Sequence, residues 1–425
     1  MLWRAMYAIA LALAWPFVVL RVRFAARGLP AERARVAERF GVVPDAIPSG
    51  VAWVHAVSAG EVIACAPLVR ELARRRPDIG ILVTTTTVTG SARARALLGE
   101  EVYHCYAPYD FGDAVERFVA RVAPRLVVLI ETELWPNTIR VCRARGVDVM
   151  LVNARLSARS ARGYAAIGAL SRAMLGDLAW IACQSAAHRD RFVALGAPAE
   201  HVDVVGNVKF DGAVPADAAR IASELRDRLA LAAGRVWIAA STHAGEDEIA
   251  LDAHASMLKR RPDLKLVLVP RHPERFAAVA ALARARGFTV ALRSEANPRR
   301  DASVVVGDSM GELFAYYSTA TVAFVGGSLV RAGGHNPIEP ARVGVPVLVG
   351  PHTFNFADVY AAFEDAHALE RVASAGELAA RVERALNDDA WRHARVDAAR
   401  AVVEVNTGAT ARITDRLAAA LDARR

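Results

Sequence analysis

From Val51 onward, short apolar runs alternate with longer amphipathic stretches. Consecutive parallel strands need a crossover helix between them, so this alternation is typical of α/β proteins whose strands are buried on both faces. The first series of expected strands is Val51–Val57, Ile79–Thr84, Leu126–Ile130, Asp148–Val152, Trp180–Gln184 and Val202–Val205. The second series is Trp237–Ala240, Leu264–Val269, Val304–Val306, Thr321–Val325 and Val345–Val349. The pattern predicts two doubly wound Rossmann-like domains that face each other across a cleft.

The length of the chain, 425 residues, also favours two domains over a single core. A polar segment with Gly and Pro, around Gly206–Pro215, interrupts the strand pattern and is interpreted as an interdomain linker. We therefore expect a first domain over 23–208, a linker and the start of the second domain over 209–234, and a second domain over 235–400. Residues 401–425 are expected to form a C-terminal helix.

The N-terminal stretch from Ala5 to Leu20 carries no charge. A full membrane span needs about 20 apolar residues, so flanking arginines would have to extend this one by snorkelling. The flanking and interfacial candidates are Trp3, Arg4, Tyr7, Trp15, Arg21, Arg23 and Arg27. Residues 1–22 are thus predicted to be a membrane-anchor helix, with the arginines placing the body on the cytoplasmic side. The alternative is a buried helix packed on the enzyme.

The net charge of +8 favours anionic partners such as phosphate ligands or an acidic membrane surface. Nucleic acid is disfavoured because the sequence has no long block of basic residues and no basic stripe interleaved with aromatics. The four cysteines form no C-x-x-C pair, which supports neither a zinc site nor a redox motif. Reduced thiols are expected.

Polar motifs follow the strands of the first domain. Ser58-Ala59-Gly60-Glu61 follows the first strand and opens a helix. Glu61 could accept a proton from an attacking hydroxyl, or could merely complement the helix dipole, which favours its ionised form. Glu131 and Glu133 follow another strand, where two carboxylates need partners. The threonines Thr84–Thr87 follow a third and could contact a sugar or cap a helix.

The second domain has the same arrangement, with polar residues after its strands. Arginine is a natural phosphate partner, glycine amides at a helix start can cradle phosphate, and a carboxylate one turn into a helix can bind ribose hydroxyls. The motifs are Ser241-Thr242-His243-Ala244-Gly245-Glu246, Pro270-Arg271-His272-Pro273-Glu274-Arg275, Gly326-Gly327-Ser328 and Gly333-Gly334-His335-Asn336-Pro337-Ile338-Glu339. They predict a nucleotide site. Neither a dinucleotide-binding nor a P-loop fingerprint is present.

Together with the apolar N-terminus, the ordered motifs S-A-G-E, E-T-E-L-W-P-N, N-A-R-L-S, G-N-x-K-F-D, P-R-H-P-E-R and G-G-H-N-P-I-E-P-A resemble those of the Kdo transferases. That family adds 3-deoxy-D-manno-octulosonic acid (Kdo) to lipid A precursors. The resemblance covers nearly the whole chain. It implies a GT-B fold, CMP-Kdo as donor, the lipid A precursor lipid IVA as acceptor, and a place at the inner membrane in lipopolysaccharide biosynthesis, with the catalytic body facing the cytoplasm.

The resemblance also implies roles for individual residues. Glu61 would be the general base and Glu131 a second essential acid. The CMP-Kdo site would comprise Ser241, Thr242, Arg271, His272, Gly327, Ser328, Asn336 and Glu339, with Lys209 meeting the donor's carboxylate or phosphate. Thr84, Arg155 and Ser157 are acceptor-side candidates. No cofactor is expected, and no metal, because arginine and helix amides can neutralise the CMP phosphate.

Two other interpretations stay open. One is a different GT-B enzyme that uses a UDP-sugar, as a transferase or an epimerase. The other is a catalytically inert, membrane-attached binding protein, whose cellular role an alanine at Glu61 would leave intact.

Overall fold

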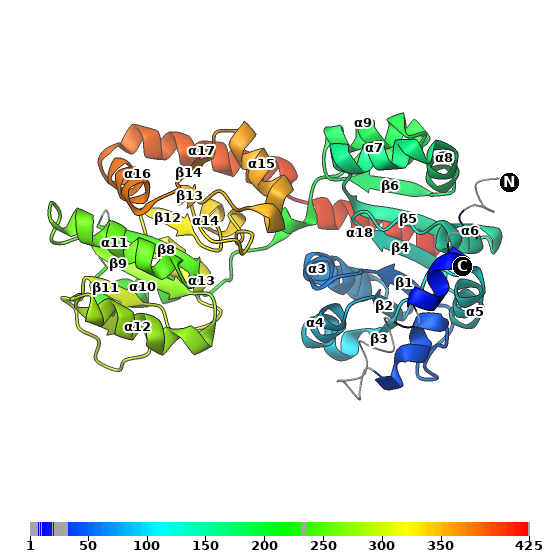
Figure 1. Cartoon of the computed structure of the whole chain (residues 1–425), viewed down its shortest axis with the longest axis horizontal. Helices are drawn as coiled ribbons and strands as arrows, with labels where there is room; N and C mark the ends of the chain where they lie inside the picture. The colour runs from blue at the N-terminus through cyan, green and yellow to red at the C-terminus, as the bar shows by residue number, and fades with distance from the viewer. Residues whose placement is uncertain are drawn as a thin grey trace. The chain divides into compact units, whose positions relative to one another are not determined.

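The computed structural model describes residues 7, 9, 11–18, 20, 33–231 and 235–423. The chain divides into two compact units (Figure 1). The first comprises Met1–Asp211 and Asn406–Arg425, and the second comprises Gly212–Val405.

The first unit is built on a seven-stranded parallel sheet in the order β3-β2-β1-β4-β5-β6-β7. Its strands are β1 (Ala52–His55), β2 (Ile81–Thr85), β3 (Tyr103–Tyr106), β4 (Leu126–Ile130), β5 (Asp148–Ala154), β6 (Trp180–Cys183) and β7 (Val202–Val204). Both faces of the sheet are covered by helices, so the central strands β1 and β4 are fully buried.

Apolar side chains from the helices form a core on each face of this sheet. On one face the core includes Phe118, Ile139, Met174 and Phe192. These come from α5 (Gly112–Val122), α6 (Pro136–Ala144), α8 (Gly168–Gly176) and α9 (Ala186–Ala194), with α7 (Ala158–Ala166) preceding α8. On the other face lie α3 (Ala59–Arg75), α4 (Val88–Leu98) and α18 (Ala409–Asp422).

The second unit repeats this architecture, with a parallel sheet in the order β10-β11-β9-β8-β12-β13-β14. Its strands are β8 (Val236–Thr242), β9 (Lys265–Pro270), β10 (Val290–Leu292), β11 (Val304–Val306), β12 (Val322–Val325), β13 (Val347–Val349) and β14 (Leu369–Arg371). Its helices are α10 (Ala218–Leu229), α11 (Glu246–Leu258), α12 (Phe276–Ala285), α13 (Leu313–Thr319), α14 (Ile338–Arg342), α15 (Ala357–Asp365), α16 (Ala375–Asn387) and α17 (Asp389–Asn406).

Every strand expected from the sequence is present, with ends shifted by at most two residues. Three further strands, β3, β10 and β14, were not predicted. All three lie at or near an edge of their sheet, where one side of the strand is not covered by a neighbour. β14 reads Leu-Glu-Arg and β3 begins with the exposed Tyr103, so neither has the continuous apolar run that marks a central strand.

Residues 209–234 were predicted to hold the linker and the start of the second domain, and α10 within them packs on α13 in the second unit. Residues 401–425 were predicted to form a C-terminal helix, and α18 within them packs against α3 and belongs to the first unit (Figure 1). Ile413 and Leu417 of α18 are fully buried in the core beside α3, because an amphipathic helix is most stable with its apolar face covered.

The described part of the N-terminal stretch contacts the body of the first unit. Residues 11–18 are helical, the Tyr7 hydroxyl donates to Asp110 Oδ2 at 2.9 Å, and the Trp15 ring packs edge-on against Phe40 and Phe111. Within the part of the chain that the structure describes, no helix combines the length and hydropathy that crossing a membrane requires. Trp3, Arg4, Arg21, Arg23 and Arg27 lie outside the described residues.

Candidate active site

Each sheet reverses its direction of winding at one point, between β1 and β4 in the first unit and between β8 and β12 in the second. In open α/β sheets, the crevice at such a switch point, beyond the carboxyl ends of the strands, is where ligands bind. The motif with Glu61 follows β1, and Glu131 follows β4. Gly326 and Gly327 likewise follow β12. The polar motifs therefore occupy both switch points.

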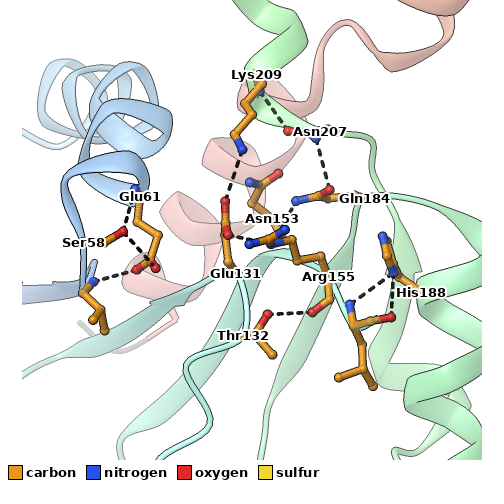
Figure 2. Close-up of polar contacts among 12 residues, drawn as sticks. Ser58, Glu61, Glu131, Thr132, Asn153, Arg155, Gln184, His188, Asn207 and Lys209 are labelled. Atoms are coloured by element: carbon orange, nitrogen blue, oxygen red, sulfur yellow. Dashed lines mark hydrogen bonds and ion pairs between the residues drawn. The ribbon is translucent and has the colours of Figure 1, made fainter. Parts of the chain in front are cut away.

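Glu61 is held by its own helix start. Ser58 caps α3 by accepting from the Glu61 amide at 3.4 Å. The Glu61 carboxylate folds back, where Oε2 accepts from the Val57 amide at 2.6 Å and Oε1 from the Ser58 hydroxyl at 3.3 Å (Figure 2). The side chain is thus fixed at the switch point instead of extending into solvent.

Burial raises the pKa of Glu61 from its usual 4.5 to about 7, with smaller contributions from the charges of Glu133 and then Glu131. This outweighs the two hydrogen bonds and the helix start, which favour the ionised form. Position at the helix start alone predicted an ionised Glu61. Burial instead brings its pKa near neutral pH, the range in which general bases act best.

Glu131 is nearly buried, with 7% of its side chain exposed, and is held between two cations (Figure 2). The Arg155 Nε donates to Oε2 at 2.7 Å, and the Lys209 Nζ lies 3.6 Å from Oε1. Its backbone φ of 60° lies in the left-handed region, which costs a non-glycine residue of order 1–3 kcal/mol and is concentrated at functional sites. The two ion pairs hold the Glu131 side chain in place just after β4.

A chain of amides extends from this ion pair across the ends of β5, β6 and β7 (Figure 2). Asn207 accepts from the Lys209 amide at 3.0 Å and donates to Gln184 Oε1 at 3.1 Å, and Gln184 donates to the Asn153 carbonyl at 3.0 Å. Asn153 Nδ2 is buried and has no hydrogen-bond partner among the described residues. None of these three amides was predicted to be a site residue. Asn153 and Asn207 were quoted in motifs, but only tertiary structure brings them together.

Glu133 was also not assigned a role from the sequence. Its carboxylate accepts from the Trp135 indole at 2.8 Å, and burial raises its pKa. Because its charge contributes to the pKa of Glu61, it belongs to the same electrostatic site.

The hydroxyl groups of two acceptor-side candidates form hydrogen bonds within the protein. Thr84 is fully buried inside the sheet, where its hydroxyl accepts from the Trp53 indole at 2.8 Å and contacts His55 at 2.9 Å. Ser157 caps α7 by accepting from the Ser160 amide at 3.0 Å. Of the acceptor-side candidates, the structure places only Arg155 against the carboxylate cluster.

In the second unit, three imidazoles gather after β8, β9 and β12. The His243 and His335 Nε2 atoms lie 2.9 Å apart with their rings parallel, and His272 meets the His243 ring edge-on at 5.5 Å between centroids. Burial lowers the pKa of His335 to about 4, with help from the charge of Arg271. Arg271 and His272 are exposed. The cluster forms a surface with donors and positive charge that suits an anion.

Asn336 and Glu339 lie beside each other at the start of α14. Asn336 Nδ2 donates to Glu339 Oε1 at 3.2 Å, and its Oδ1 accepts from the Ile338 amide at 3.0 Å. Burial raises the pKa of Glu339, while the charge of Arg271 opposes that effect. Arg271 therefore lies near enough to act electrostatically on both Glu339 and His335.

Other predicted donor-site residues are engaged within the protein. The amides of Gly327, Ser328 and Leu329 donate to the buried carboxylate of Glu246 at 2.7–2.9 Å. The amide nest that could cradle a phosphate thus already holds an anion. Gly327 has a φ of 69°, and a Cβ there would lie 3.0 Å from the His335 ring.

Ser241 and Thr242 are also buried, and the Thr242 hydroxyl donates to Asp247 at 2.6 Å. Of the residues predicted from the second unit, Arg271, His272, Asn336 and Glu339 therefore stay the candidates for contacts with the donor.

All four cysteines, Cys65, Cys105, Cys142 and Cys183, are free and buried, as expected. Over residues 33–231 and 235–423 and the described N-terminal positions, no three His, Cys, Asp or Glu side chains are grouped so as to hold a metal ion.

Comparisons with a family model and with known sequences point to the same kind of enzyme. Residues 34–212 match the family described as 3-deoxy-D-manno-octulosonic-acid transferase (kdotransferase). A 3-deoxy-D-manno-octulosonic acid transferase of Haemophilus influenzae is 40% identical over 98% of both chains. One of Bordetella pertussis is also 40% identical, over 89% of this chain and 90% of its own.

Similarity to a solved structure supports the fold but says nothing about the function. HepE of Anabaena, solved in complex with UDP, is 13% identical, covers 88% of this chain and all of its own, and superposes with a TM-score of 0.53. It is thus a GT-B-like neighbour of the two-sheet architecture described above. From the whole-length sequence similarity, we conclude that the chain belongs to the 3-deoxy-D-manno-octulosonic acid transferase family of glycosyltransferases.

Proposed function

We propose that this protein transfers Kdo from CMP-Kdo to a sugar hydroxyl of a lipid A precursor, lipid IVA, in lipopolysaccharide core biosynthesis. The observation that carries the proposal is Glu61, fixed at the switch point of the first unit with a pKa of about 7. The relatives that share 40% of its sequence are named as transferases of the same sugar.

In the proposed reaction, Glu61 takes the proton of the acceptor hydroxyl as its oxygen attacks the anomeric carbon of Kdo. The bond from that carbon to the phosphate oxygen of CMP breaks, and CMP leaves with the electron pair. Direct displacement inverts the anomeric centre. Glu131, held by Arg155 and Lys209, would keep the polar strand ends around the acceptor in place.

CMP leaves as an anion, and its charge must be stabilised. The exposed Arg271 supplies positive charge, and the imidazoles of His272 and His335 supply N–H donors. The Asn336–Glu339 pair would accept hydrogen bonds from the ribose hydroxyls. This arrangement needs no metal ion for the leaving group.

For the location, we propose the inner membrane, with the body on the cytoplasmic side. Ile9, Leu13, Phe17 and Leu20 are each more than half exposed and recur at the spacing of one helix face. Tyr7 and Trp15 pack on the body instead. An apolar face left outward on a packed segment suits insertion into the membrane interface.

The test is the mass of the product formed when the purified full-length chain is incubated with CMP-Kdo and lipid IVA. We expect lipid IVA to gain the mass of one or more Kdo residues, with release of CMP. UDP-sugars are the matched alternative donors. Consumption of a UDP-sugar with no use of CMP-Kdo would contradict the proposal and favour another GT-B activity.

A further inference from the structure

A cavity of about 750 Å³ lies beside the carboxylates of the first unit. Its walls are the loop after β4, the α7–α8 corner, and Tyr7 from the N-terminal stretch. This volume falls within the range of small-molecule sites, roughly 300–1,000 Å³. The reaction proposed above does not use this cavity.

The walls of the cavity are mainly apolar. Leu134, Leu170 and Met174 are buried, and Ile167 stands at the α7–α8 corner with 47% of its surface exposed. The Tyr7 hydroxyl is already bound to Asp110. A ligand that fits these walls must be largely apolar, because burying polar groups there would leave them without partners.

Polar groups enter the lining on the β4 side. Thr132 and Glu133 line the cavity and directly follow Glu131 in the chain. The charge of Glu133 raises the pKa of both Glu61 and Tyr164, and Tyr164 is itself part of the lining. Glu133 therefore both lines the cavity and acts electrostatically on Glu61.

We propose that this cavity binds a fatty acyl chain of the acceptor while the sugar to which that chain is attached meets Glu61. This inference rests on the proposed function, because it assigns the acceptor of that reaction an acyl subsite. An amphiphile with its polar head at the carboxylates and its tail along Leu170 and Met174 matches the order of polar and apolar walls. Each methylene buried should tighten binding roughly fourfold.

The test compares two acceptors with CMP-Kdo as donor in detergent: a tetraacylated glucosamine disaccharide bisphosphate and the same disaccharide without acyl chains. The variant is Ile167→Asp, which places a charge at the cavity wall. The control is Val42→Asp, since Val42 is 49% exposed and does not line the cavity. For Ile167→Asp, we expect the ratio of kcat/KM between the acylated and deacylated acceptors to fall at least tenfold, through KM. Val42→Asp should keep the wild-type ratio.

A second variant distinguishes loss of the acyl subsite from misfolding. Ile167→Trp keeps an apolar side chain and fills the cavity, so it should lower the same ratio even if Ile167→Asp melts early. A wild-type ratio near one, or an unchanged ratio in both Ile167 variants, would overturn the acyl subsite while leaving Kdo transfer intact. A wild-type enzyme that uses neither acceptor would overturn the proposed function and this inference with it.

Discussion

Burial, with a smaller contribution from the charges of Glu133 and Glu131, sets the pKa of Glu61. Removing its charge while keeping its shape, in Glu61→Gln, should lower the transfer rate about 10²–10⁴-fold. CMP binding should stay unchanged, because the donor-site candidates Arg271 and Glu339 belong to the second unit and Glu61 belongs to the first. At pH 8 the variant should melt no lower than the wild type, because burial disfavours the ionised carboxylate that it lacks. Turnover by mass spectrometry, CMP calorimetry and a melting curve at pH 8 measure the three effects.

Glu71→Gln is the matched control, since Glu71 lies on the same helix and pairs with Arg74 and Arg75 at the surface. It should transfer Kdo at the wild-type rate. Equal losses of transfer rate in the two variants would mean that the integrity of α3, and not the Glu61 carboxylate, determines the rate.

The raised pKa of Glu61 predicts the pH dependence of the reaction. A base works only when ionised, so kcat/KM should rise as the pH increases through about 7 and level off above it. Glu133→Gln removes a charge that raises this pKa, so the midpoint of the profile should move to lower pH. A midpoint that stays in place in Glu133→Gln, or a rate that falls as the pH rises from 6 to 7, would contradict the assignment.

Donor recognition is predicted to depend on Arg271 and Glu339. Arg271→Ala and Glu339→Ala each remove a charged partner of CMP, which should weaken binding roughly ten- to a hundredfold in calorimetry. Arg284→Ala is the control, because Arg284 is exposed in the same unit with its guanidinium 4.0 Å from Glu295. If both donor-site variants bind CMP as the wild type does, the nucleotide site lies elsewhere.

Among the secondary-structure elements, every strand in the middle of a sheet was predicted from the sequence, whereas of the four edge strands only β7 was. β4 reads Leu-Val-Val-Leu-Ile, and a strand buried on both faces must be apolar throughout. The same logic located Glu61 and Glu131, since polar residues stand out where such a run ends. Edge strands such as β14 lack this constraint.

Tertiary contacts explain what the sequence could not show about the site. Glu246 lies far along the chain from the amides of Gly327 and Ser328, and nothing local indicates that its carboxylate would occupy them. Asn153, Gln184 and Asn207 likewise become neighbours only because β5, β6 and β7 are adjacent.

The start of α18 is fixed from outside the helix. The Asp211 carboxylate accepts from the amides of Gly408 and Thr410, as a capping residue does. Asp211→Ala should cost about 0.5–2 kcal/mol and increase hydrogen exchange across α18. Asp415→Ala, which breaks only the surface pair with Arg75, should cost less. Equal protection of α18 in both variants would argue against this cap.

For the molecule as a whole, the outward apolar residues of the N-terminal stretch predict membrane association. Leu13→Asp with Phe17→Asp should reduce binding to vesicles containing anionic lipid, and should slow transfer to acceptor embedded in vesicles. Transfer to acceptor dispersed in detergent should be kept, because neither side chain contacts the carboxylates. Flotation with vesicles measures the first effect. Val405→Asp, a charge at another exposed apolar position, is the control and should bind vesicles normally.

α18 belongs to the first unit but follows Gly212–Val405 in the chain. The first unit therefore cannot close its core until the whole second unit has been synthesised. While the second unit emerges from the ribosome, the apolar surface of α3 that Ile413 and Leu417 will cover stays open. The contacts that close it are among the longest in sequence separation, and such contacts form late. A nascent chain stalled before Ala409 would therefore be a substrate for chaperones, whereas the second unit could already have closed its own core.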